Sequence, residues 1–216
     1  MSSRALAVTR AAYDSVAVAY AAHVAGELAG KPLDRALLAA LLELAGDGVV
    51  ADIGCGPGHV TASLAGSGAR VFGLDLSPEM CRLARASTSL PFGAADMTAL
   101  PVRSSSLAAI VSWYAVIHLD DQQRAAAYRE FCRVLRPAGH ALIAFHTADQ
   151  EIRPGGQRTM TQWLGAEVAL TFRFLDPVRE VDALRDAGLT LVARLDRPHV
   201  PDVEYPSERS YLLVRR

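Results

Sequence analysis

Three glycines at alternate positions, directly after a short apolar run, restrict the fold of this chain more than any other feature. The run 49–53 is rich in β-branched residues, as expected of a buried strand, and Gly54, Gly56 and Gly58 follow it. From His59 onward the residues favour a helix. Glycine lets a ligand approach the main chain, and the first turn of a helix presents free N–H groups. The stretch therefore predicts a strand, a turn and a helix that bind a polar or anionic small molecule.

The spacing of the glycines separates this turn from two common nucleotide-binding loops. The dinucleotide fingerprint is Gly-x-Gly-x-x-Gly, and here the third glycine comes one position too early. The phosphate-binding loop requires Lys and then Ser or Thr after its last glycine, whereas His59 and Val60 follow here. Asp52, two residues before the first glycine, suits a ligand that carries an ammonium group.

Strands and helices alternate from residue 49 onward, which predicts a parallel sheet with helical crossovers. The predicted strands are 49–53, 69–75, 91–95, 107–113, 140–146, 189–195 and 209–215. Before them, residues 4–29 favour a helix that could be broken near Asp14, where Ser15 could cap a second helix. Residues 33–44 carry a leucine stripe typical of another helix, and residues 147–175 are predicted to be irregular.

Three acidic residues fall at the ends of the first three predicted strands. In open α/β sheets, ligands bind outside the carboxyl ends of the strands, where Asp52, Asp75 and Asp96 lie. Asp75 comes 21 residues after Gly54, close to the spacing of about 20 residues for a carboxylate that binds ribose hydroxyls. Asp75 could instead cap a turn, and Asp96 could be an ordinary loop carboxylate.

Four segments in order resemble the class I S-adenosylmethionine (SAM) dependent methyltransferases, in particular small-molecule enzymes with methyltransferase domains of types 11 and 25. Asp52–Gly58 resembles motif I, Asp-x-Gly-x-Gly-x-Gly, and Gly93–Met97 resembles the segment whose acidic side chain meets the adenine amino group. Ser112–Leu119 resembles the stretch after the fourth strand. Arg133–Gly139 resembles the family's Arg-x-Leu-x-Pro-Gly-Gly turn, with Ala138 in place of the first glycine.

The resemblance runs from about Tyr13 to the C-terminus and implies a single domain over residues 1–216. It implies an α/β fold of the Rossmann-like, doubly wound type, with a mostly parallel seven-stranded sheet, its last strand antiparallel, plus N-terminal helices. Residues 1–46 would form a helical cap and residues 147–175 a substrate-side insertion, with the acceptor pocket between them. Within the cap, Tyr13 and Tyr20 share a helix face that meets either the cofactor or only the sheet.

The resemblance also implies SAM as the cofactor. Asp75 would accept hydrogen bonds from the ribose hydroxyls, Asp96 would meet the adenine and Met97 would pack on its ring. Trp113 could equally be strand-end core, and Lys31 could be a solvated charge instead of a partner for the methionine carboxylate. The candidate cofactor-binding residues are Asp52, Gly54, Cys55, Gly56, Gly58, Asp75, Leu76, Met80, Asp96, Met97, Trp113, Tyr20 and Lys31.

The reaction of the family is an in-line displacement, in which a lone pair of the acceptor attacks a methyl group on a positively charged sulfur. The protein mainly aligns the reactants and excludes water, and an acceptor that must lose a proton needs a base. His118 and His146 follow the fourth strand and end the fifth, on the acceptor side, so they are the candidate catalytic residues. His118 could instead only hydrogen-bond the cofactor or a loop. The predicted activity is methyl transfer from SAM to an oxygen, nitrogen or sulfur atom of a small molecule.

Other functions and several acceptor types stay open. A SAM-binding protein could perform non-methylating chemistry or act as a partner, and a nicotinamide-dependent oxidoreductase shares the strand, turn and helix but requires the later glycine. For the acceptor, Trp163, Phe172 and Phe174 indicate an apolar lining. Arg153 or Arg158 could meet an acidic group.

Charge and cysteine content limit which partners and which cellular location we expect for this chain. The net charge is −1 with no basic run, which argues against a nucleic-acid partner because phosphate neutralisation needs clustered Lys and Arg. Three widely spaced cysteines fit neither a disulfide framework nor a zinc site, so we expect a cytoplasmic location. No apolar run reaches the roughly 20 residues of a membrane span. We expect a monomer or homodimer that uses a small-molecule acceptor and no metal.

Overall fold

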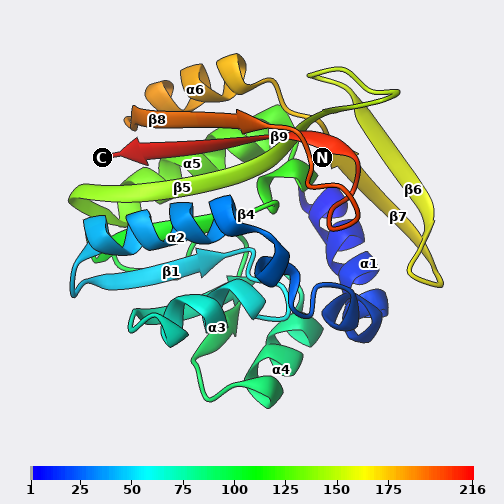
Figure 1. Cartoon of the computed structure of the whole chain (residues 1–216), viewed down its shortest axis with the longest axis horizontal. Helices are drawn as coiled ribbons and strands as arrows, with labels where there is room; N and C mark the ends of the chain where they lie inside the picture. Colours follow the sequence, from blue (N-terminus) through cyan, green and yellow to red (C-terminus); the bar gives the residue numbers. More distant parts are fainter. Residues whose placement is uncertain (1) are drawn as a thin grey trace.

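The computed structural model describes residues 2–216, in which helices pack on both faces of a seven-stranded sheet (Figure 1). The strand order is β3-β2-β1-β4-β5-β9-β8. The strands are β1 (Val49–Ile53), β2 (Arg70–Asp75), β3 (Phe92–Ala94), β4 (Leu107–Trp113), β5 (Leu135–Asp149), β8 (Thr190–Arg197) and β9 (Ser207–Arg215). β1 to β5 pair in parallel, while β9 is antiparallel to both β5 and β8. This topology confirms the predicted Rossmann-like fold with its last strand antiparallel.

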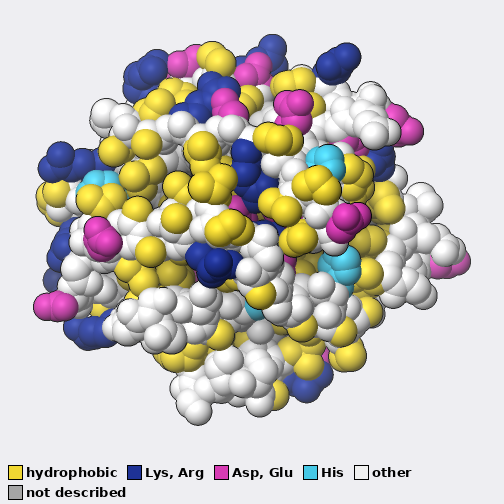
Figure 2. All heavy atoms as spheres, in the orientation of Figure 1, with side chains coloured by type: hydrophobic (Ala, Val, Ile, Leu, Met, Phe, Trp, Pro, Cys, Tyr) yellow, Lys and Arg dark blue, Asp and Glu magenta, His cyan; other side chains and the backbone are white. Residues whose placement is uncertain are grey.

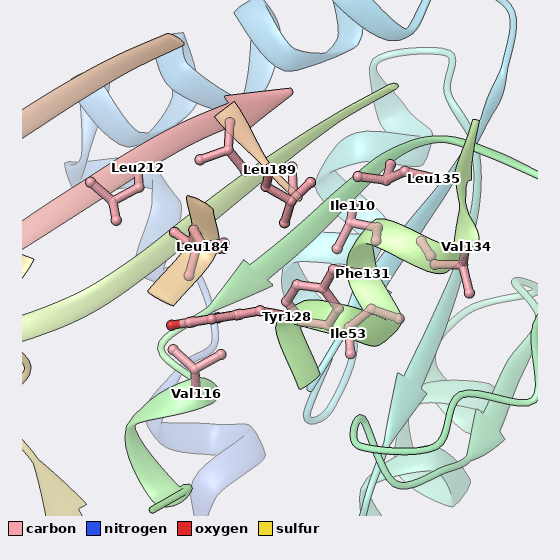
Figure 3. Close-up of a cluster of buried hydrophobic side chains, with 14 of the residues drawn as sticks. Ile53, Ile110, Val116, Tyr128, Phe131, Val134, Leu135, Leu184, Leu189 and Leu212 are labelled. Carbon is pink, nitrogen blue, oxygen red and sulfur yellow. The ribbon is translucent and has the colours of Figure 1, made fainter. Parts of the chain in front are cut away.

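Two hydrophobic layers hold the helices on the sheet. The helical segments are α1 (Ser2–His23), η1 (Glu27–Gly30), α2 (Pro32–Ala45), α3 (His59–Gly66), α4 (Pro78–Ser87), η2 (Val116–His118), α5 (Asp121–Val134) and α6 (Pro177–Asp186). α5 and α6 pack on one face, where Ile110, Phe131 and Leu184 belong to one buried cluster (Figure 3). α2 and α3 pack on the other face, where Leu64 lies with Val111. Adjacent residues of β4 thus enter both layers, which is why this central strand is apolar almost throughout.

The strand order reverses between β1 and β4, and this reversal places the candidate site. From β1 the chain moves outward through β2 and β3, then returns to the other side of β1 as β4. Asp52 of β1 pairs in register with Gly73 of β2 and Val111 of β4, so the carboxyl ends of these strands meet at one edge. Ligands of open α/β sheets bind at such a switch point.

α1 is a single helix from Ser2 to His23, and the predicted break near Asp14 is wrong. Ser15 does not cap a second helix, because its Oγ donates to the carbonyl of Ala12 (2.7 Å). The Asp14 carboxylate accepts a hydrogen bond from Ser77 Oγ (2.5 Å), the residue that caps α4. Asp14, one of the two polar residues that resembled a helix start, therefore ties the middle of α1 to α4.

Residues 147–175, predicted to be irregular, contain a β-hairpin. Strands β6 (Gln157–Trp163) and β7 (Ala166–Arg173) pair antiparallel, apart from the main sheet, and β7 packs beside α1 (Figure 1). Between them, Leu164 and Gly165 have φ of 48° and 82°, as in two-residue hairpin turns with two positive φ values. The prediction failed because leucine occupies a turn position where asparagine, aspartate or glycine is usual.

β5 is longer than predicted. It extends from Leu135 to Asp149 instead of 140–146. Residues 137–139, which resemble part of the family's turn, lie within this strand, where its pairing with β4 is irregular. The remaining predicted strands agree with the observed bounds to within two residues. Local patterns therefore located the strands of the main sheet, and they failed where a turn continues as part of a strand.

Candidate functional site

The glycine turn has one open side, at Gly56. Gly56 has φ of 53°, and a Cβ placed there would lie 3.5 Å from the nearest side-chain atom, in the ring of Tyr20. Gly58 begins α3 with φ of 85°, and its Cβ would lie only 2.7 Å from the ring of Phe92. The main chain is therefore approachable at Gly56 and enclosed at Gly58.

Asp75 ends β2 beside this open position. One carboxylate oxygen accepts from the N–H of Gly56 (2.7 Å) and the other from the N–H of Ser77 (2.8 Å). Burial raises the pKa of Asp75 to about 6, although these backbone donors favour the charged form. Each carboxylate oxygen has a further lone pair with which to accept from a ligand.

A cavity of about 70 Å³ lies at the carboxyl ends of β1, β2 and β4, with α1 over it, and it brings together residues far apart in the sequence. The predicted residues that line it are Tyr20, Gly54, Gly56, Asp75, Leu76, Asp96, Met97, Trp113 and His118. The indole N–H of Trp113 is buried and has no hydrogen-bond partner among the described residues.

Six predicted residues do not line this cavity. They are Asp52, Cys55, Gly58, Met80, Lys31 and His146. Asp52 is fully buried and accepts from the hydroxyl of Thr61 (2.7 Å), and burial raises its pKa to about 6. Lys31 is buried between two carboxylates, Glu27 and Glu204, the second at 3.1 Å. Cofactor contact by the first five residues, and a catalytic role for His146, stay predictions.

His118 is held between β7 and α1 in one tautomer. Its Nδ1 lies 2.9 Å from the carbonyl oxygen of Thr171, which can only accept, so Nδ1 carries the proton. Nε2 therefore accepts from the hydroxyl of Tyr13 (2.7 Å). Burial lowers the pKa of His118 to about 4, and the charge of Arg173 also lowers it. At neutral pH the ring is uncharged and offers a lone pair at Nε2.

His146 contacts the cavity only through Tyr114. Its ring stacks on Tyr114 with centroids 4.7 Å apart, and its Nδ1 lies 2.8 Å from the hydroxyl of Ser207. Burial lowers the pKa of His146 to about 3, and Arg209 lowers it as well. Tyr114, which lines the cavity, has φ of 53°, a rare conformation for so bulky a residue and one that is frequent at functional sites.

Five rings from α1, η2 and the hairpin pack together beside the cavity, and we call them the aromatic cluster; Tyr13, Tyr20 and His118 line the cavity, and the other two rings pack against them. Their centroids lie between 5.0 and 5.7 Å apart in each contacting pair. The members are Tyr13, Tyr20, His118, Trp163 and Phe172. Tyr13 is one of the lining residues that the candidate set lacked, although its spacing of one heptad from Tyr20 placed both on one helix face. Phe174, expected in the same lining, instead contacts His146.

A larger cavity of about 270 Å³ lies between α5, α6 and the base of the hairpin, away from the strand ends. It contains none of the candidate cofactor-binding or catalytic residues. Its central Arg124 is paired with Glu180 (3.1 Å) and Asp121 (2.5 Å), so this positive charge is already neutralised. The smaller cavity is therefore the candidate site, because it holds nine of the predicted residues and the larger cavity holds none.

Comparisons with known proteins concern the same part of the chain. Residues 50–139 match a family model described as a methyltransferase domain. An uncharacterized methyltransferase of Bacillus velezensis is 32% identical over 111 residues, which are 50% of this chain and 51% of that protein. A tRNA (carboxymethyluridine(34)-5-O)-methyltransferase of Macaca fascicularis is 38% identical over 105 residues, 48% of this chain and 15% of that protein. The chain spans about half the length, or less, of these curated relatives.

A solved structure shares the fold over nearly the whole chain. It is the 1,6-didemethyltoxoflavin-N1-methyltransferase of Burkholderia thailandensis, solved with bound 1,6-didemethyltoxoflavin and S-adenosylhomocysteine. Its TM-score is 0.74 at 23% sequence identity, and the match covers 97% of this chain and 88% of that one. The structural match includes α1 and the hairpin, whereas the family model matches only residues 50–139.

Proposed function

We propose that this chain is a methyltransferase that uses SAM, because residues 50–139 belong to the methyltransferase domain family, which uses SAM. The chain transfers the methyl group of SAM to an oxygen, nitrogen or sulfur atom of a small molecule. The observation that carries the proposal is the pair of Asp75 and Gly56 at the switch point of the sheet. There a carboxylate and an approachable main chain face one cavity, as a bound nucleoside requires.

The groups that line the cavity fit this cofactor. Asp75 and Asp96 offer carboxylate oxygens to ribose hydroxyls and to an adenine amino group, and Met97 offers an apolar surface for the base. Two carboxylates also suit a cofactor with a positively charged sulfur. When bound, SAM supplies a methyl group on a sulfonium whose departure leaves a neutral thioether.

The cavity must enlarge to admit a whole nucleoside. Its volume of about 70 Å³ is well below the roughly 300 Å³ at which small-molecule sites begin. Tyr20 lies over Gly56, and Trp163 of the hairpin packs on Tyr20 with centroids 5.4 Å apart. We infer that α1 and the hairpin separate when SAM enters and close again over the bound cofactor.

The residues of this chain align the reactants, exclude water and hold a proton. Tyr13 and Tyr20 of the aromatic cluster line the cavity, with Trp163 packed against them, and these rings would keep water away from the reacting atoms. His118 lines the same space, and its neutral Nε2 accepts from Tyr13, so an acceptor that displaces the Tyr13 hydroxyl would give its hydrogen bond or its proton to this nitrogen. His146 is a positioning residue that acts through the stacked ring of Tyr114.

The charge distribution favours a small-molecule acceptor. On the face shown in Figure 2, Lys and Arg are dispersed among Asp and Glu and form no continuous basic patch. A nucleic acid requires clustered cations, and the net charge of the chain is −1. The relatives named above act on tRNA and on 1,6-didemethyltoxoflavin, so their names alone do not select an acceptor.

Membrane contact and assembly are separate questions. Within residues 2–216, no helix combines the length and the hydropathy needed to cross a bilayer. The cytoplasmic location and the monomeric or homodimeric state stay predictions from the sequence.

Ligand titration tests the proposal most directly. In isothermal titration calorimetry with SAM, S-adenosylhomocysteine, NAD and NADP, we expect the first two to bind with Kd near roughly 10 μM and the nicotinamides not to bind. Binding of a nicotinamide alone would favour the oxidoreductase. Binding of SAM without release of S-adenosylhomocysteine, whatever acceptor is screened by mass spectrometry, would favour a non-methylating role.

Replacing His118 with glutamine tests the role of the histidine. We expect the single-turnover rate of methyl transfer to fall about 100-fold, because the proton-accepting lone pair is lost, while the Kd for S-adenosylhomocysteine stays within about twofold. His146→Gln is the matched control, with a smaller loss because that ring acts through Tyr114. Unchanged rates for His118→Gln across pH would contradict a role in proton transfer.

A further inference from the structure

We propose that the methyl acceptor is a neutral, planar aromatic molecule that donates a hydroxyl or ring N–H hydrogen to Nε2 of His118. The inference rests on the methyl-transfer function proposed above and identifies the class of its substrate. Three independent features of the cavity carry it: the sign of the charges in the lining, the rings that close it, and the hydrogen-bonding polarity of His118.

The only charged side chains in the described lining are Asp75 and Asp96. An anionic acceptor would lose its hydration in a lining that holds two carboxylates and no Lys or Arg, and the sulfonium charge of SAM that could pair with it is lost in the transfer. The cost of an unpaired buried charge amounts to several kcal/mol, which binding would have to overcome. The lining therefore disfavours carboxylate, phosphate and other anionic acceptors.

The basic residues of the hairpin region do not supply the missing cation. Arg158 is paired with Asp149 (3.1 Å) and with the carboxylate of Glu151 (2.8 Å). Arg173 donates to the main-chain carbonyl of His118 (2.8 Å). Arg153 is exposed and does not line the cavity. The option that Arg153 or Arg158 receives an acidic group is therefore disfavoured by the structure.

The aromatic cluster offers flat apolar walls on two separate elements. Trp163 of the hairpin contacts Tyr13 and Tyr20 of α1 at 5.7 and 5.4 Å between centroids, with interplanar angles of 89° and 51°. These edge-to-face and tilted contacts bury ring faces against ring edges. When α1 and the hairpin separate, the exposed ring faces match the apolar face of a flat aromatic molecule, which can take over the lost contacts.

His118 determines which polar atom the acceptor must present. The carbonyl of Thr171 holds the proton on Nδ1, so Nε2 can only accept, and at present it accepts from Tyr13. Burial raises the pKa of Tyr13 well above its usual value, so this phenol stays a donor. An acceptor O–H or N–H can replace Tyr13 in this hydrogen bond, whereas a carboxylate or a carbonyl cannot.

The same polarity fits the transfer step. The proton of the acceptor passes to Nε2, and the electron pair left on the acceptor atom forms the bond to the methyl carbon. The carbon–sulfur bond breaks with its electrons remaining on sulfur, and the imidazolium later releases the proton to water. A quaternary ammonium has neither such a proton nor a free electron pair, so it cannot act as the acceptor. The acceptor must be neutral before it reacts.

Three naphthalene probes of one shape test the charge preference on the full chain saturated with S-adenosylhomocysteine. They are neutral 2-naphthol, anionic 2-naphthoate and a cationic trimethyl-(2-naphthyl)ammonium, each titrated by calorimetry. We expect 2-naphthol to bind at least about tenfold more tightly than either charged probe. Equal or tighter binding of the anion or the cation overturns the inference, as does a lack of 2-naphthol binding when S-adenosylhomocysteine binds. Failure of S-adenosylhomocysteine itself to bind overturns the proposed function instead.

Two variants and one control separate the site from the fold. Trp163→Leu should weaken 2-naphthol binding at least about fivefold more than it weakens S-adenosylhomocysteine binding, because Trp163 meets the cofactor side of the cavity only through Tyr20. Tyr205→Leu, which removes an exposed ring outside the aromatic cluster, should change neither constant. Thr9→Arg places a cation in the lining and should strengthen 2-naphthoate binding about tenfold. Equal effects of Trp163→Leu and Tyr205→Leu, or no gain with Thr9→Arg, would count against this site.

Discussion

Alanine at Gly56 should abolish SAM binding in a folded protein, whereas alanine at Gly58 should destabilise the protein itself. Both glycines have positive φ, 53° and 85°, so each alanine costs about 1 to 2 kcal/mol from the left-handed backbone alone. They differ in what the new Cβ meets. At Gly56 it enters the open side of the turn, 3.5 Å from the Tyr20 ring, where the cofactor would approach the main chain.

At Gly58 the new Cβ would lie 2.7 Å from the Phe92 ring and 3.0 Å from Ala84 Cβ, inside packed structure. Overpacking adds about 1 to 3 kcal/mol, so we expect Gly58→Ala to lose about 2 to 5 kcal/mol of unfolding free energy in urea titrations. For Gly56→Ala we expect a loss of only about 1 to 2 kcal/mol, together with a rise of at least about 100-fold in the Kd for S-adenosylhomocysteine. Normal affinity in Gly56→Ala would show that the cofactor does not approach this turn.

The second large effect concerns Asp75. Replacing it with asparagine removes the negative charge that would accept from the ribose hydroxyls, and charge-assisted hydrogen bonds contribute about 1.5 to 3 kcal/mol. We expect the Kd for S-adenosylhomocysteine to rise about 30- to 100-fold at pH 8, measured by calorimetry. Asp182→Asn, on the exposed side of α6, is the matched control and should bind normally.

The raised pKa of Asp75 also predicts how affinity depends on pH. The group ionises with a pKa of about 6 in the ligand-free protein, and donors from a bound ribose favour its charged form. Affinity for S-adenosylhomocysteine should therefore rise as the pH increases from 5 to about 7 and then level off. Asp75→Asn should lose most of this dependence. A wild-type affinity that is flat over the same range would contradict the assignment of Asp75 to the ligand.

Folding stability should respond to Asp75 in the opposite direction. Because the folded pKa of about 6 lies above the ordinary value of 3.8, the contribution of this group to stability is fully present below about pH 4 and is lost as the pH rises through 6. The ionised carboxylate of Asp75, which ligand binding requires, therefore lowers the folding stability of the ligand-free protein. Asp52, with the same direction of shift, adds to this trend.

Much of the fold and half of the site could be predicted because their signals are local. The apolar run of β4 identifies a strand buried on both faces, and it is buried throughout. The alternation of strands with capped helices, such as α5 after Asp120, predicts the crossovers. The glycine spacing and the position of Asp75 after it depend only on distances along the chain, and both residues reach the cavity.

Contacts between distant segments could not be predicted in this way. Lys31 pairs with Glu204 in a loop before the last strand, and no pattern within a window of residues indicates that pairing. The hairpin was not predicted, because its turn carries Leu164. The first helix was predicted to break in two, because Asp14 and Ser15 resemble a helix start. In each case a partner far away in the sequence or an unusual turn residue outweighed the local preference.

Periodicity and spacing along the chain encode the order of strands and helices, the glycine turn and the carboxylates at the strand ends, so these features follow from the residues alone. Packing between distant segments brings Tyr13, His118 and Trp163 together beside the cavity, and it leaves the described lining of that cavity without Lys or Arg. These residues come from the N-terminal helix, the turn after β4 and a hairpin. Their meeting depends on how the three elements pack, which is a property of the whole fold and not of any one segment.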